Sequence, residues 1–204
     1  MARQAKLDGE IATFLHPTHL YSQQEVLARP SPVPASPGVY GWWFRGLPGP
    51  VDIQGCATRD GLPLLYIGIS PSRPPISGKP ASRQNLRKRL RQHYDRSAEA
   101  STLRRTLGCL LADDLGLQLR RVGSTGRRTT FVDGEHALSD WMGKHAFVSW
   151  VVREEPWELE EALIGQLDLP LNLKDNSGNA FHPVLTEARA RCLAQARALP
   201  VLPG

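Results

Sequence analysis

The chain has 204 residues, of which 41% are hydrophobic and 22% are charged, a composition typical of a globular domain with a real core. No apolar run approaches the roughly 18 residues of a membrane span, and the polar N-terminus lacks a signal-peptide core, so we expect a cytoplasmic protein without a membrane partner. Lysine and arginine outnumber aspartate and glutamate 25 to 20, and the resulting formal charge of +5 favours an anionic partner, nucleic acid before membrane.

The first third of the chain alternates between strand-like runs and loops rich in glycine and proline. Residues 1–37 read as an arm with one short helix and a proline-rich connector, since proline fits neither a helix interior nor a central strand. The runs GVYGWWF (38–44) and LLYIGI (64–69) read as strands. Loops are predicted over 45–63, which is long enough to suggest a functional insertion, and over 70–81.

The remaining two thirds alternate helices with short strands. Amphipathic periodicity and end signals, including Ser82 as an N-cap and Gly116 as a helix end, predict helices over 82–94, 101–116, 133–145, 156–167 and 184–199. β-Branched and aromatic residues predict strands over 117–123, 129–132 and 146–154. This irregular alternation indicates a small sheet with helices packed around it.

One glutamate on the helix over 156–167 breaks the pattern of its own face. Trp157, Leu159, Leu163 and their apolar neighbours define a buried arc, and Glu160 points within about 15° of its centre at 100° per residue. A carboxylate on an apolar line is costly unless it is paired. Its partner is an arginine in a structural ion pair, a hydrogen-bond network or a metal ion, and the sequence leaves these three open.

The helix over 82–94 carries a second unusual pair. Arg89 and His93 lie four residues apart, beside the apolar stripe of Leu86, Leu90 and Tyr94, so they are neighbours in space. An arginine in this place can hold a phosphate in fork geometry, and a histidine can transfer a proton near neutral pH. Each alone is more simply read as a surface or rim residue.

Two strand tyrosines, Tyr40 and Tyr66, and the asparagine of PLN, Asn172, complete a set with a common chemistry. Phosphodiester cleavage needs a group that orients or deprotonates water, a cation that stabilises the phosphorane, and a carboxylate that holds a divalent ion. Taken alone, both tyrosines are ordinary strand residues. Taken together, the six positions point to a nuclease.

The motifs GVY, YIG, LRKRLRQH, ELEEALI and PLN, in this order, resemble those of the GIY-YIG nuclease superfamily. The resemblance covers about residues 36 to 176. It implies an α+β fold with a small central antiparallel sheet of about three strands flanked by helices. It also implies catalytic roles for Tyr40, Tyr66, Arg89, His93, Glu160 and Asn172, with one Mg²⁺ or Mn²⁺ bound through Glu160. Asn176 is the alternative to Asn172, because PLN is one residue shorter here than the repair-type motif.

The resemblance implies a metal-dependent endonuclease that acts on DNA. We expect a catalytic domain over 38–176 with the insertion 45–63, an N-terminal arm, and a helical extension over 177–204. Four further basic residues of the Arg89 helix are predicted to grip the phosphate backbone: Arg83, Arg87, Lys88 and Arg91. The alternative is a non-catalytic module on the same scaffold, which binds nucleic acid or an adaptor protein.

Overall fold

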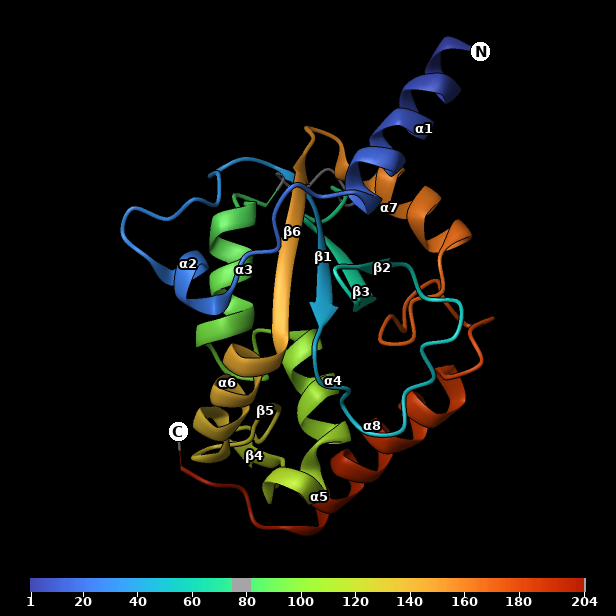
Figure 1. Cartoon of the computed structure of the whole chain (residues 1–204). Coiled ribbons are helices and arrows are strands. Elements are labelled where there is room, and N and C mark those ends of the chain that lie inside the picture. The colour runs from blue at the N-terminus through green and yellow to red at the C-terminus, as the bar shows by residue number, and fades with distance from the viewer. Residues whose placement is uncertain (75–81, 204) are drawn as a thin grey trace.

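The computed structural model describes residues 1–74 and 82–203 and is built around one antiparallel sheet (Figure 1). The strands are β1 (Gly38–Phe44), β2 (Thr58–Arg59), β3 (Leu62–Ser70) and β6 (Ala146–Val152). They lie in the order β2-β3-β1-β6, so β1 is central and pairs antiparallel with β3 and β6. This confirms the predicted α+β fold, with the two-residue strand β2 added to the three expected strands.

Alternation along β1 sends its side chains to two separate cores. Tyr40, Trp42 and Phe44 belong to the larger cluster, whereas Val39 and Trp43 belong to the smaller one. All seven residues of β1 are buried, because helices cover both faces of the sheet. The larger core contains side chains of α3, α4, α6 and α8, and the smaller core contains side chains of α1 and α7.

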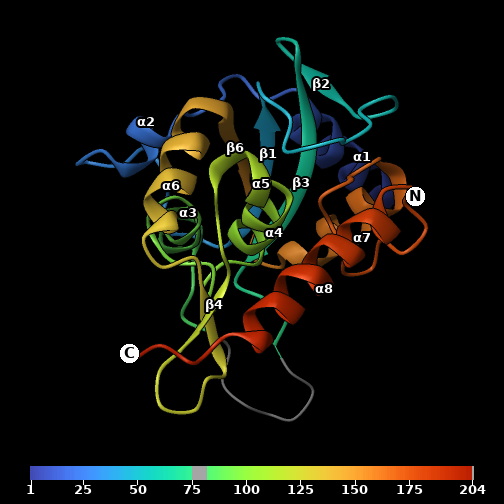
Figure 2. The same ribbon diagram turned by 90° about the horizontal axis from the view of Figure 1, so that it is seen from below.

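The helices predicted after residue 81 agree with the structure apart from their ends, whereas the sequence did not predict the helix over residues 2–15. The helices of the structure are α1 (Ala2–Leu15), α2 (Gln23–Leu27), α3 (Leu86–Asp95), α4 (Thr102–Leu110), α5 (Ala112–Leu115), α6 (Gly134–His145), α7 (Pro156–Gln166) and α8 (His182–Ala198). A separate hairpin joins β4 (Arg120–Val122) to β5 (Arg128–Thr130). Figures 1 and 2 place α8 beside α4, and the two helices are in contact.

Two predicted helix boundaries differ from the structure. Helix α3 begins at Leu86 rather than near Ser82, because the Asn85 side chain caps it by accepting a hydrogen bond from Lys88 N. The helix predicted over 101–116 breaks at Leu111 into α4 and α5, and its end at Gly116 is as predicted, with a left-handed φ of 62°. Residues 75–81 of the predicted loop lie outside the described residues.

The N-terminal segment is tied to the sheet and to α3. Helix α1 packs on β6 and α7, and its Phe14 is only 1% exposed. Tyr21 exchanges two backbone hydrogen bonds with Val148, at 2.8 and 2.9 Å, which covers the open edge of β6. Arg87 Nε donates to Val33 O at 2.6 Å, and Arg91 Nη2 donates to Leu27 O at 3.2 Å. The segment predicted as an arm therefore supplies part of the core.

We expect Phe14→Ala to lower the free energy of unfolding by about 3–5 kcal/mol, the usual cost of removing a buried phenylalanine ring. Urea denaturation measures this loss. Thr13→Ala is the matched control, because Thr13 is the preceding residue of the same helix and is exposed. Equal stability of the two variants would show that α1 does not contribute to the core in solution.

Candidate active site

Tyr40 of β1 lies across Gly68 of β3. The two residues are direct partners in the antiparallel pair. A Cβ atom added to Gly68 would lie 2.6 Å from the Tyr40 hydroxyl oxygen, which is closer than any side chain tolerates. The phenol therefore needs a glycine opposite it, and this is the physical reason for the glycine of YIG.

Helix α3 brings two side chains to the Tyr40 hydroxyl. His93 Nε2 lies 2.8 Å from the Tyr40 oxygen, and Arg89 Nε donates a hydrogen bond to the same oxygen at 3.2 Å. Arg89 also donates from Nη1 to the carbonyl of Ala100 at 3.0 Å, which fixes its guanidinium group. The structure thus brings together three of the predicted residues, from one strand and from successive turns of one helix.

His93 is completely buried between two hydroxyl groups. Its Nδ1 lies 2.7 Å from Ser101 Oγ, which also caps α4 by accepting a hydrogen bond from Arg104 N. Burial holds the pKa of His93 well below its usual value, and the positive charges of Arg89 and Arg104 add to this effect. The imidazole is therefore neutral at neutral pH, with one ring nitrogen donating and the other accepting.

Both phenols are held in their protonated form. Burial raises the pKa of Tyr40, while the charge of Arg89 partly offsets this rise. The pKa of Tyr66 is also raised, first by burial and then by Tyr40 and Glu160, against the opposite effect of Arg89 and Arg189. The pKa of Tyr66 is thus affected by charged side chains of α3, α7 and α8. Both tyrosines act as neutral hydrogen-bonding groups in this state.

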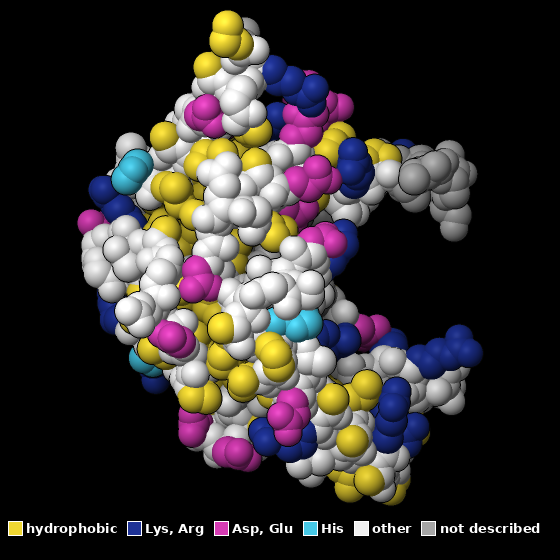
Figure 3. All heavy atoms as spheres, turned by 90° about the vertical axis from the view of Figure 1, so that its right-hand side faces the viewer, with side chains coloured by type: hydrophobic (Ala, Val, Ile, Leu, Met, Phe, Trp, Pro, Cys, Tyr) yellow, Lys and Arg dark blue, Asp and Glu magenta, His cyan; other side chains and the backbone are white. Residues whose placement is uncertain are grey.

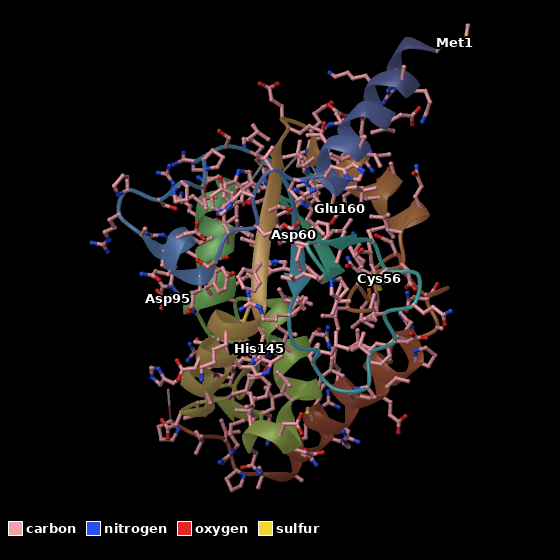
Figure 4. The ribbon with its side chains drawn as sticks, in the orientation of Figure 1. Met1, Cys56, Asp60, Asp95, His145 and Glu160 are labelled. Carbon is pink, nitrogen blue, oxygen red and sulfur yellow. The ribbon has the colours of Figure 1, made fainter. Side chains whose placement is uncertain are left out.

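Glu160 faces a cleft of about 510 Å³, which is also lined by Tyr66, Asn172, Lys174 and Arg189. Figure 4 shows Glu160 on the side of α7 that faces the sheet. Burial raises its pKa to about 7, the charges of Asp175 and Glu161 add to the rise, and Lys174 opposes it. Within residues 1–74 and 82–203, its carboxylate has no hydrogen-bond or ion-pair partner, unlike Glu158 and Glu161 on the same helix. The structural ion pair that the sequence left open is thus not formed by any described residue.

A half-buried carboxylate without a donor fits a hard divalent cation, which prefers oxygen ligands and keeps several of its waters. Among the described residues, no group of three or more histidine, cysteine, aspartate or glutamate side chains is placed to hold a metal ion. Glu160 is the residue that would bind Mg²⁺ or Mn²⁺ in this cleft.

The side-chain amide of Asn172 is held by the backbone of β3. Its Oδ1 accepts a hydrogen bond from Ile67 N at 2.9 Å, and its Nδ2 donates to Ile67 O at 3.0 Å. Both ends of the amide are thus occupied by the backbone of β3 between Tyr66 and Gly68. Asn172 thus holds the β3 backbone beside Tyr66, and its catalytic role stays a prediction. Asn176 donates to the carbonyls of Leu169 and Asn172 and holds the same loop.

The residues on and before α3 that are predicted to bind the phosphate backbone contact main-chain carbonyls or border a surface hollow. Arg87 and Arg91 donate to main-chain carbonyls of the N-terminal segment, as described above. Lys88 Nζ lies 3.4 Å from Arg83 O. Lys88, Arg91 and Arg96 also border a hollow of about 420 Å³ that includes Ala100, the residue bound by Arg89. Contact of these residues with nucleic acid stays a prediction.

Sequence reasoning missed Ser101, Arg104 and Arg189. Ser101 precedes a helical run and carries the signal of an N-cap. Arg189 lies on the buried stripe of α8, four residues after Leu185 and three before Cys192. This is the same anomaly that singles out Glu160, a charge on an apolar stripe.

Tyr66, Glu160 and Arg189 line one cleft of the small antiparallel sheet and its helices, and Tyr40 on the neighbouring strand is hydrogen-bonded to Arg89 and His93. The sequence matches the GIY-YIG catalytic domain over residues 38–191, and the chain belongs to this family. The match begins with β1 and continues past the predicted domain end at 176 into α8. No curated protein and no solved structure matches the chain. In the described part of the chain, every helix is too short or too polar to span a membrane.

We expect Gly68→Ala to destabilise the protein by about 1–3 kcal/mol, because the added methyl group overpacks against a phenol held by two hydrogen bonds. Urea denaturation measures the change. Gly165→Ala on α7 is the control: its Cβ would meet nothing within 4 Å, so the variant should be unchanged or slightly more stable. A neutral Gly68→Ala would contradict the packing of Tyr40 on Gly68.

Glu160 predicts a characteristic dependence of stability on pH. Its folded pKa of about 7 is above the unfolded value, so the folded state holds a proton that the unfolded state has released. Stability of the wild type should fall, relative to Glu160→Gln, as pH rises from the unfolded pKa to about 7. Thermal unfolding in EDTA at acidic and alkaline pH measures the difference in stability between the wild type and Glu160→Gln. Added Mn²⁺ should raise the melting temperature of the wild type alone. Parallel pH profiles, or equal stabilisation by Mn²⁺, would refute the carboxylate assignment.

Proposed function

We propose that this protein is a divalent-metal-dependent endonuclease that hydrolyses phosphodiester bonds in DNA. One observation carries the proposal: Tyr66 and Glu160 line the same cleft, and Arg89 is hydrogen-bonded to Tyr40 on the neighbouring strand. A phosphate beside Tyr66 would therefore be within reach of a cation bound at Glu160 and of a fixed guanidinium. Family membership supports the same reaction class.

Each of the site residues would have a distinct role in hydrolysis. Tyr40 and Tyr66 orient the attacking water through their hydroxyl groups, and neutral His93 holds Tyr40 in place. Arg89 stabilises the negative charge that develops on the phosphate oxygens. Glu160 would hold the divalent ion, which supplies Lewis-acid stabilisation of the phosphate and of the departing oxygen. Asn172 keeps the backbone beside Tyr66 in place.

Purified protein incubated with supercoiled plasmid or single-stranded DNA should cut with Mg²⁺ or Mn²⁺ and not with EDTA. Glu160→Ala should lower the rate by a factor on the order of 10² to 10³, comparable to the loss of one transition-state contact, while leaving DNA binding largely intact. Glu161→Ala is the matched control, because Glu161 is the next residue on α7, is exposed and pairs with Arg73 at 2.9 Å.

The outcomes separate the proposal from the alternative. Cleavage in EDTA, or full activity of Glu160→Ala, would overturn the metal-dependent mechanism. Tight DNA binding with no cleavage by the wild type under any metal would instead support a non-catalytic binding module.

A further inference from the structure

Two arginines meet at the contact between α4 and α8, on the cleft side of the molecule. Arg189 of α8 lines the cleft with Tyr66 and Glu160, and its Nη1 donates to Thr106 Oγ1 of α4 at 3.3 Å. Arg105 of α4 is the residue before Thr106, the hydrogen-bond partner of Arg189. Burial lowers the pKa of Arg189, and the charge of Arg105 lowers it further. Both side chains are partly buried.

Neither arginine has an acidic partner. Among residues 1–74 and 82–203, the ion pairs leave out both Arg105 and Arg189. Arg105 Nη2 donates to Ala98 O at 3.3 Å, but its buried Nε has no acceptor among the same residues. The contrast with Arg104 is clear, since that neighbouring guanidinium pairs with Glu135 at 2.7 Å.

Such a pair is unfavourable in the free protein. Two like charges repel each other, and partial burial removes part of their hydration. Packing alone does not require a charge, since Arg189 lies on the stripe of Leu185, Ala188 and Cys192, where an apolar side chain would fit. An anion between the two guanidinium groups would relieve both costs, and a phosphate matches their fork geometry.

We propose that Arg189 in the cleft and Arg105 beside it form a second phosphate site, which holds a backbone phosphate of the nucleic acid near the one that is cleaved. The identity of this ligand rests on the proposed function. Arg189 and Tyr66 line the same cleft, and Arg89 is hydrogen-bonded to Tyr40 on the neighbouring strand, so a strand passing Tyr66 would place one phosphate at Arg89 and another at Arg189. On the face drawn in Figure 3, several lysine and arginine side chains lie along the right-hand border of the described residues.

The site can be tested by binding alone. Fluorescence anisotropy with labelled duplex and single-stranded oligonucleotides in EDTA, over a series of salt concentrations, gives both Kd and its salt slope for the wild type, Arg189→Ala, Arg189→Lys and Arg105→Ala. Arg191→Ala is the matched control, because Arg191 is exposed on the same helix and points about 200° away from Arg189. Thermal unfolding confirms that each variant is folded.

Arg189→Ala and Arg105→Ala should each weaken duplex binding by about 5- to 20-fold and reduce the salt slope by about 0.9, the amount for one lost phosphate contact. Arg189→Lys should keep most of the slope, because it keeps the charge, and Arg191→Ala should match the wild type. Loss of stability alone would not change the slope, so a structural role for Arg189 is distinguishable from a phosphate contact.

If Arg189→Ala and Arg191→Ala have the same Kd and slope, the second phosphate site is refuted, whether or not the protein cuts DNA. Inorganic phosphate is titrated as a competitor in the same assay. Millimolar phosphate that binds through Arg189, while oligonucleotide affinity is independent of Arg189, would overturn the nucleic-acid assignment in favour of a free-phosphate site. Binding that depends on Arg189, in a protein that never cleaves, would support the site and refute the nuclease proposal.

Discussion

The candidate site depends on the register between β1 and β3, because that register places the Tyr40 phenol over Gly68. A shift of one residue would move Tyr40 to the opposite face of the sheet and separate it from His93. Gly38 allows the same close approach between β1 and β6, since a Cβ there would lie 2.3 Å from Val151 O. The two glycines beside the phenols are thus consequences of close packing between strands.

The buried ion pair between Arg104 and Glu135 affects both the packing of the helices and the charge of the site. Arg104 is fully buried and donates to Glu135 and to the carbonyls of His93 and Tyr94, so it joins α4 to α6 and to the end of α3. Such a pair is tolerated because the guanidinium nitrogens of Arg104 and both carboxylate oxygens of Glu135 have hydrogen-bond partners. Its charge also helps to keep His93 neutral. The same contact therefore stabilises the helical layer and, together with burial, keeps His93 neutral beside Tyr40.

The sequence predicted the parts of the site that have a local signature and missed those that depend on partners. Glu160 and Arg89 stand out because each interrupts or borders an apolar stripe, and the structure places both near Tyr66. Arg189 carries the same signature, but charges on the final helix are easily read as surface residues. The role of Asn172 could not be read at all, because its partner is a backbone segment 105 residues away. A local sequence pattern shows that a polar side chain is buried at a cost in free energy, but it does not show which partner offsets that cost.

The cleft combines neutral groups from the sheet with charged groups from the helices. Tyr66 lies on β3, whereas Glu160 and Arg189 line the same cleft from α7 and α8, and Arg89 of α3 is hydrogen-bonded to Tyr40. Without a bound anion and cation, this arrangement is costly on both sides: the acid has a raised pKa, and the arginine of α8 faces another arginine. A polyanion bound together with a divalent ion would neutralise both sides at once. On the proposed function, simultaneous binding of metal and nucleic acid would therefore be favoured over binding of either one alone.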